Sequence, residues 1–134
     1  MEKLRIALAD DHPLIREALR KALSERNIEV VAEASDGVEL LTMLGDLPVS
    51  PDIVIVDFTM PQLEGSEVAR RIRRLFPRIK ILMFTMHAEK EYVDQAFAAG
   101  ANGYLLKEEG TAELFAAIRA IRSGKRYSSP QLAA

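Results

Sequence analysis

The hydrophobic pattern of this chain alternates between two periods, and that alternation constrains the fold more than any other feature. Short apolar runs that suit strands occupy residues 4–9, 28–34, 53–56, 79–84 and 104–106. A segment with helical spacing follows each run: one opens at His12-Pro13, two are capped by Asp36 and Ser66, and two span residues 89–99 and 111–123. Five alternations of this length predict an α/β fold, in which a parallel sheet carries helices on both faces.

The predicted helices have apolar faces that we expect to cover this sheet. Leu14, Val38 and Leu75 fall among the apolar positions of the first, second and third helix. The third helix also carries a group of arginines, which we expect to form its solvated face: Arg70, Arg71, Arg73, Arg74 and Arg78.

The composition favours one domain and excludes several classes of function. The 134 residues include no cysteine, which rules out disulfides, thiolate zinc sites and cysteine nucleophiles. A net charge of −2 argues against direct binding of duplex DNA. No apolar run is long enough to span a membrane, and the charged residues near the start leave no room for a signal peptide, so we expect a cytoplasmic protein. We assign residues 1–124 to the domain and residues 125–134 to a tail or the start of a linker.

Polar and charged residues stand where the predicted strands end. They are Asp10, Asp11, Asp57, Thr85 and Lys107. In open α/β sheets the binding crevice lies outside the carboxyl ends of the strands. Converging carboxylates repel one another unless a cation separates them, and oxygen ligands of this kind suit Mg²⁺. The alternative is that these aspartates are unrelated and only cap the following turns.

The same residues carry a resemblance to a known family. In order along the chain they are Asp10-Asp11, Asp57 with Met60-Pro61 and Gly65, Thr85, and Tyr104 with Lys107. This arrangement resembles the receiver domain of two-component response regulators. The stretch from Met86-His87-Ala88-Glu89 to Lys107 is similar to the NarL/LuxR-type subfamily. The resemblance implies a flavodoxin-like (βα)5 fold with five parallel strands in the order 2-1-3-4-5.

The resemblance also implies a role for each residue of the site. Asp57 is the expected phosphoacceptor, and Lys107 is expected to neutralise the phosphoryl group. Asp11 and Asp57 are expected to bind Mg²⁺ directly, Asp10 through water, and Thr59 through its backbone carbonyl. Such a domain is a signalling protein, and its only expected reactions are its own phosphorylation and dephosphorylation.

Two further pairs of residues are expected to act around the phosphorylated group. Thr85 and Tyr104 are expected to form the switch, in which the hydroxyl moves to the phosphoryl group and the ring follows. His87 with Thr59 is expected to govern water access to the acyl phosphate, or else His87 is an exposed loop residue. Neither His12 nor His87 is expected to bind Mg²⁺, because imidazole does not suit that ion.

Partners follow from the resemblance as well. A sensor histidine kinase is the expected phosphoryl donor, and DNA is expected to be reached only through a helix-turn-helix domain absent from this chain. Phosphorylation is expected to favour a homodimer.

The alternatives are a stand-alone receiver that acts by protein contacts and a degenerate receiver that is never phosphorylated. An Mg²⁺-dependent phosphohydrolase is disfavoured because Thr59 stands where that class has the aspartate that acts as general acid. A flavin-binding module is disfavoured because Asp10 and Asp11 would repel the phosphate of the flavin.

Two departures from the family pattern stand out. Glu108 follows the lysine where many receivers have proline, so we do not assume a cis peptide there. Phe58 replaces the more usual aliphatic residue after the phosphoacceptor, without a clear consequence for the chemistry.

Overall fold

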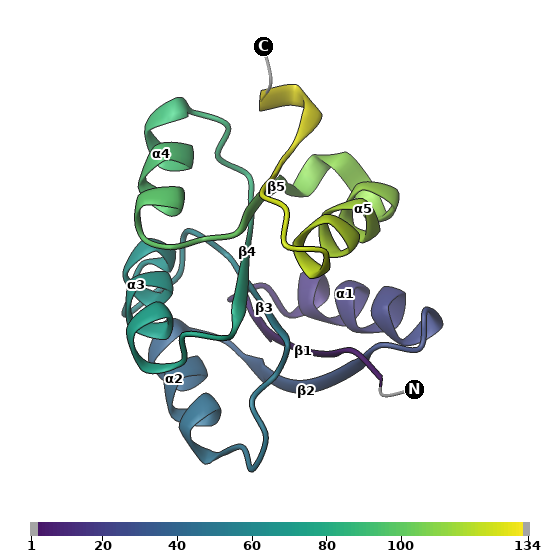
Figure 1. Cartoon of the computed structure of the whole chain (residues 1–134), viewed down its shortest axis with the longest axis vertical. Helices are drawn as coiled ribbons and strands as arrows, with labels where there is room; N and C mark the ends of the chain where they lie inside the picture. Colours follow the sequence, from purple (N-terminus) through teal and green to yellow (C-terminus); the bar gives the residue numbers. More distant parts are fainter. Residues whose placement is uncertain (1–2, 133–134) are drawn as a thin grey trace.

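The computed structural model describes residues 3–132 and contains one parallel sheet with helices on both faces (Figure 1). The strand order is β2-β1-β3-β4-β5-β6, and every neighbouring pair is parallel. The strands are β1 (Arg5–Ala9), β2 (Glu29–Ala34), β3 (Ile53–Val56), β4 (Lys80–Thr85), β5 (Gly103–Leu106) and β6 (Tyr127–Ser128). The flavodoxin-like α/β architecture is therefore confirmed.

Five α-helices cover the two faces of the sheet. They are α1 (Pro13–Glu25), α2 (Gly37–Asp46), α3 (Gly65–Leu75), α4 (Lys90–Ala98) and α5 (Gly110–Arg122). Figure 1 shows α1 and α5 on one face and α2, α3 and α4 on the other. Two short 3-10 helices, η1 (Lys107–Glu109) and η2 (Pro130–Leu132), follow β5 and β6. Among residues 3–132, no helix is both long and apolar enough to cross a membrane.

The strands divide their side chains between two hydrophobic cores. Along β3, Val54 and Val56 pack with α2, α3 and α4, whereas Ile53 and Ile55 pack with α1 and α5. This division follows from the period of two in a strand, which points successive side chains to opposite faces. All four residues of β3 are buried, as expected for a central strand covered on both sides.

Local signals account for several helix ends. Pro13 begins α1, and the Asp36 carboxylate accepts a hydrogen bond from Glu39 N at 2.8 Å at the start of α2. Gly100 and Gly124 follow α4 and α5 with φ of +108° and +85°, a conformation that glycine adopts without strain.

The prediction that Ser66 caps α3 was wrong. A cap at Ser66 would start the helix at residue 67, but the helix begins two residues earlier, at Gly65, and Ser66 is buried in its first turn. The reason is a close approach that only the folded chain creates: a Cβ at residue 65 would lie 2.6 Å from the carbonyl oxygen of Asp57. Glycine lets the start of α3 pack directly against the end of β3.

The sheet has six strands, so the prediction of five was wrong. The sixth strand comes from the segment assigned to a tail or linker, where Tyr127 and Ser128 pair with Gly103 and Tyr104 of β5. Two hydrogen bonds continue the attachment: Ser129 N donates to Tyr104 O at 3.0 Å, and Leu106 N donates to the Ser129 hydroxyl at 2.8 Å. A two-residue polar strand has no alternating pattern to reveal it, because the neighbouring edge supplies its order.

Three apolar side chains expected to face the core lie in solvent instead. Leu14, Val38 and Leu75 are exposed, whereas Leu40 and Leu44 provide the buried side of α2. Helical spacing defines a wide apolar stripe, and packing against the sheet selects only part of it.

Candidate functional site

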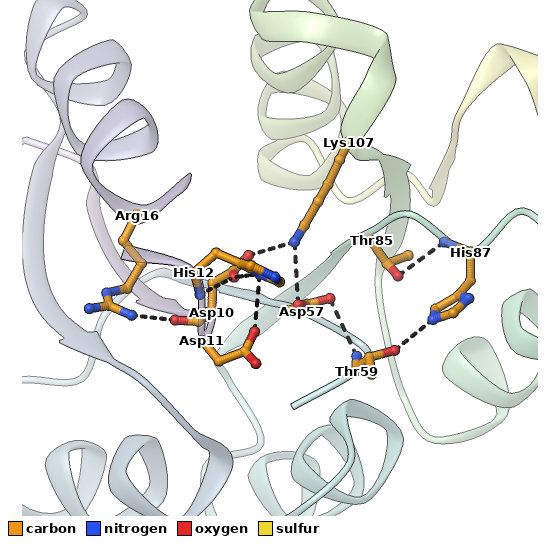
Figure 2. Close-up of polar contacts among 9 residues, drawn as sticks. All are labelled: Asp10, Asp11, His12, Arg16, Asp57, Thr59, Thr85, His87 and Lys107. Atoms are coloured by element: carbon orange, nitrogen blue, oxygen red, sulfur yellow. Dashed lines mark hydrogen bonds and ion pairs between the residues drawn. The ribbon is translucent and has the colours of Figure 1, made fainter. Parts of the chain in front are cut away.

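The carboxyl ends of β1, β3 and β5 bring three charged side chains together (Figure 2). Lys107 Nζ lies 2.8 Å from Asp10 Oδ2 and 3.3 Å from Asp57 Oδ2, so one ammonium group bridges two carboxylates. Both aspartates are almost completely buried, at 2% and 4% exposure. Because the parallel strands end at the same edge, residues that lie 47 and 50 positions apart in the sequence meet here.

Asp57 is in an environment that disfavours its charged form. Burial raises the pKa of the Asp57 carboxyl above its usual value, and the nearby Asp10 carboxylate raises it further. The Lys107 ammonium and the hydrogen bond from Thr59 N to Asp57 Oδ1 act in the opposite direction. The raised pKa indicates that the cation at this site only partly compensates for the loss of water around the carboxylate.

The turn after β1 gathers the second carboxylate and a histidine at the same place. The Asp10 carboxylate accepts hydrogen bonds from His12 N and from His12 Nδ1, both at 2.9 Å. The same Nδ1 atom lies 3.1 Å from Asp11 Oδ1. Arg16 donates to the carbonyl oxygen of Asp10 at 2.5 Å and holds this turn against α1.

The donor set fits a hard divalent cation. Asp10, Asp11 and Asp57 offer carboxylate oxygens that lie within 4.8 Å of one another. The other carboxylate oxygen of Asp10, Oδ2, is buried and accepts no hydrogen bond, although the Lys107 ammonium lies 2.8 Å away as an ion pair. Mg²⁺ takes oxygen ligands and is often held by one or two carboxylates together with water and phosphate oxygens. These residues therefore suit that ion chemically, and the carbonyl group of Thr59 lies on the adjacent loop (Figure 2).

The two expected switch residues meet on the backbone of His87. Thr85 Oγ1 accepts a hydrogen bond from His87 N at 3.2 Å, and the Tyr104 hydroxyl donates to His87 O at 2.7 Å. Both side chains are completely buried. Burial raises the pKa of the Tyr104 phenol far above its usual value, so the hydroxyl remains a donor. The loop between β4 and α4 is thus held at one residue by both side chains.

The side chain of His87 connects this loop to the loop that follows Asp57. Thr59 Oγ1 and His87 Nε2 are 2.6 Å apart. The imidazole ring also packs against Tyr92, with ring centres 4.6 Å apart, and Tyr92 packs edge-on against Phe58 at 5.1 Å. The sequence singled out the Thr59–His87 pair but missed this aromatic cluster. In the sequence Phe58 stands out only as a departure from the family pattern, and helical spacing in α4 carries no signal that Tyr92 turns toward it.

One arginine of α3 has a structural role that the sequence did not indicate. Arg73 donates hydrogen bonds to the carbonyl oxygens of Gly100, Pro77 and Ile79 and to the side chain of Asn102. The prediction that Arg73 belongs to a solvated face was therefore wrong. Its partners lie in two loops that come next to α3 only in the folded chain, so helical spacing could not reveal them.

Comparison with known proteins gives one consistent result. The sequence profile described as "Response regulator receiver domain" matches residues 6–119. Response regulator GacA of Pseudomonas viridiflava is 37% identical over 131 residues, which cover 97% of this chain and 60% of GacA. The chain thus spans about 60% of the length of such curated relatives.

Solved structures agree with the sequence relatives. A two-component response regulator of the LuxR family from Aurantimonas sp. SI85-9A1 superposes with a TM-score of 0.91 at 42% identity, over 98% of this chain and 94% of that one. The isolated REC domain of RcsB from Salmonella enterica serovar Typhimurium, in the presence of phosphomimetic BeF3⁻, gives a TM-score of 0.89 at 26% identity, over 98% and 97% of the two chains.

Proposed function

Because the chain belongs to the response regulator receiver domain family, with relatives in the NarL/LuxR group, we propose that it is a phosphorylation switch in which Asp57 accepts the phosphoryl group. The observation that carries the proposal is the buried bridge of Lys107 between Asp57 and Asp10. A buried carboxylate with a raised pKa and a lysine in contact is a costly arrangement for stability alone.

The chemistry assigned to Asp57 is nucleophilic displacement at phosphorus. One carboxylate oxygen of Asp57 attacks the phosphoryl group of a phosphohistidine, the new O–P bond forms, and the N–P bond breaks. The electron pair stays on the imidazole nitrogen of the donor, which takes up a proton. Lys107 Nζ is already 3.3 Å from Asp57 Oδ2, so it can donate to a phosphoryl oxygen after a small movement.

We assign the Mg²⁺ site to the same edge of the sheet. Asp11, Asp57 and the carbonyl oxygen of Thr59 would hold the ion directly, and Asp10 would hold it through water. When bound, Mg²⁺ supplies positive charge to the phosphoryl oxygens. Asp10 keeps Lys107 oriented toward Asp57 through the 2.8 Å contact.

The phosphorylation signal is proposed to leave the site through the backbone of His87. A new phosphoryl oxygen competes for the hydroxyl of Thr85, which now accepts from His87 N. Tyr104 holds the carbonyl oxygen of the same residue, so any movement of that peptide changes the packing of Tyr104 in β5. A local hydrogen bond thereby shifts the balance between two packing arrangements of the surface formed by α4, β5 and α5.

The contact between Thr59 and His87 is proposed to protect the acyl phosphate. The 2.6 Å hydrogen bond joins the loop that follows Asp57 to the loop between β4 and α4. Removal of either side chain should open a path for water and shorten the lifetime of the phosphorylated protein.

The partners are proposed from the relatives. A sensor histidine kinase is the phosphoryl donor in the cytoplasm, and a helix-turn-helix domain beyond residue 134 would bind DNA, since a structure of the relative RcsB is a complex with DNA. Phosphorylation would favour a homodimer. The alternative is a stand-alone receiver that acts by protein contacts.

Phosphorylation of Asp57 can be tested directly by intact-mass spectrometry. Acetyl phosphate with Mg²⁺ should add one phosphoryl group to the wild type and to Asp94→Asn, a control at an exposed aspartate of α4, but none to Asp57→Asn. Equal labelling of Asp57→Asn, or no labelling of the wild type, would refute the assignment.

A further inference from the structure

Residues 126–132, which we call the C-terminal segment, lie along the edge of the sheet beside β5. The segment contains β6 and η2, and Figure 1 shows it with α4 on one side and α5 on the other. Ser129, in the middle of the segment, is completely buried although it is polar. A buried polar side chain needs hydrogen-bond partners, so the segment occupies a specific seat on the domain.

The hydrogen bonds of this seat join one residue of the segment to two residues of β5. Ser129 N donates to Tyr104 O at 3.0 Å, and Leu106 N donates to the Ser129 hydroxyl at 2.8 Å. Leu106 is itself buried, and a buried N–H that loses its acceptor is costly unless water can reach it. The segment therefore satisfies backbone groups of β5 at the edge of the sheet.

The two ends of the segment contact the elements on either side of β5. The Arg126 guanidinium lies 3.6 Å from the centre of the Phe97 ring in α4. The Tyr127 hydroxyl donates a hydrogen bond to the Glu113 carboxylate in α5. Leu132 packs against the hydrophobic core on the side of α2, α3 and α4. The segment thus covers part of the surface that α4, β5 and α5 form.

Tyr104 connects this seat to the residues around Asp57. Its carbonyl oxygen holds the C-terminal segment, and its hydroxyl donates to His87 O at 2.7 Å. The N–H of His87 in turn donates to Thr85 at 3.2 Å. Because the Tyr104 side chain is completely buried, it cannot follow a movement of His87 without repacking in β5. The docked segment therefore fits the arrangement in which Thr85 still holds His87.

We propose that docking of the C-terminal segment on β5 opposes phosphorylation of Asp57, and that phosphorylation in turn loosens the segment. This inference rests on the proposed function, in which the phosphoryl group draws Thr85 away from His87. Coupling between two sites is reciprocal, so a change that weakens docking must strengthen the binding of a phosphoryl mimic by the same factor. The element with two arrangements is Tyr104 with the edge of β5, which both events require in different positions.

The affinity for beryllofluoride in the presence of Mg²⁺ tests this coupling, because that anion mimics a phosphoryl group and fluorine NMR can follow its binding. Ser129→Ala removes the acceptor of Leu106 N, and Arg126→Gln removes the cation above Phe97 while leaving the hydrogen bonds of β5 intact. We expect each variant to bind beryllofluoride about fivefold more tightly, or more, than the wild type. The matched controls Ser128→Ala and Lys125→Gln change exposed neighbours and should bind it as the wild type does.

The reverse direction is measured on the wild type by hydrogen exchange at the Leu106 amide and by tryptic cleavage after Arg126. Both should become faster when beryllofluoride and Mg²⁺ are added, because the segment leaves its seat. A purely structural role of the segment would leave both rates unaffected by the anion.

Unchanged beryllofluoride affinity in Arg126→Gln, or Leu106 exchange that ignores the anion in the wild type, would overturn the inference. Arg126→Gln decides the matter even if Ser129→Ala does not fold. Labelling of Asp57 by acetyl phosphate is followed in the same samples. If Asp57 is labelled but the segment does not respond, the coupling fails and the proposed function stands. If Asp57 is not labelled, the proposed function fails and the coupling fails with it.

Discussion

Replacing Lys107 by methionine should reveal how much of the stability of this domain depends on one buried cation. The substitution keeps the length of the side chain and removes its charge, which leaves Asp10 and Asp57 facing each other with 2% and 4% exposure. Oxygen atoms of the two carboxylates lie within 4.8 Å, and two charges at that distance repel by about 3 kcal/mol at an effective dielectric constant of about 20. Removing one partner of a buried ion pair typically costs about 3–5 kcal/mol.

We therefore expect Lys107→Met to lose about 3 kcal/mol of unfolding free energy at pH 7.5 in the presence of a chelator. Two conditions should reduce this loss. At lower pH Asp57, whose pKa burial raises, takes up a proton, and the repulsion disappears. With Mg²⁺ the ion supplies the missing positive charge, and its preferential binding to the folded state adds stability.

Urea denaturation at several pH values, with chelator or with Mg²⁺, measures all of these effects. Lys90→Met is the matched control, because Lys90 pairs with Asp94 on the surface and its side chain is 88% exposed. The reasoning would be refuted if Lys107→Met were as stable as Lys90→Met in chelator at pH 7.5, or if its deficit grew as the pH fell.

Three further substitutions test other parts of the structure. Burial raises the pKa of Asp57, so the stabilising contribution of this carboxyl is present below pH 3.8 and is lost as the pH rises through the folded pKa. Asp57→Asn should therefore melt at a higher temperature than the wild type at pH 7.5 in chelator. A lower melting temperature would contradict this. Ser129→Ala leaves the buried N–H of Leu106 without its acceptor, so it should lower the free energy of unfolding by about 1–3 kcal/mol and speed hydrogen exchange at that amide. Unchanged exchange would show that β6 does not protect β5. Arg73→Leu removes the donor to four acceptors in two loops, and we expect it to lower the free energy of unfolding in urea by about 2–3 kcal/mol. The control Arg74→Leu, at the exposed neighbour, should change that free energy little. Equal effects of the two substitutions would disprove the structural role of Arg73.

The sequence contained enough information to place most of the site. The carboxylates of Asp10 and Asp57 and the ammonium of Lys107 each follow an apolar run, and parallel strands end at a common edge. An ionised residue at the end of a buried strand is costly unless it has a partner, which is a physical reason to expect these groups to meet. Their contacts in the structure agree with that expectation.

The partners of other polar side chains could not be predicted in this way. Arg73 lies in the same helix and carries the same charge as arginines that are exposed to solvent, and only the packing of Gly100 and Asn102 beside α3 gives it acceptors. The ring of His12 is similar: its position in the sequence explains a turn, but its place between two carboxylates depends on the rotamer that the folded turn allows.

The sequence by itself determined the order of strands and helices along the chain, a sheet covered on both faces, and which charged residues end the strands. These features follow from hydrophobic period and residue type, which can be read from a few neighbouring positions. Only the tertiary structure decided that Tyr127 and Ser128 extend the sheet, that Leu14 remains in solvent, and that the carbonyl oxygen of His87 accepts a hydrogen bond from Tyr104. Each of these depends on a free sheet edge, a packing face or a loop contributed by residues far away in the chain, and such contacts have no local pattern.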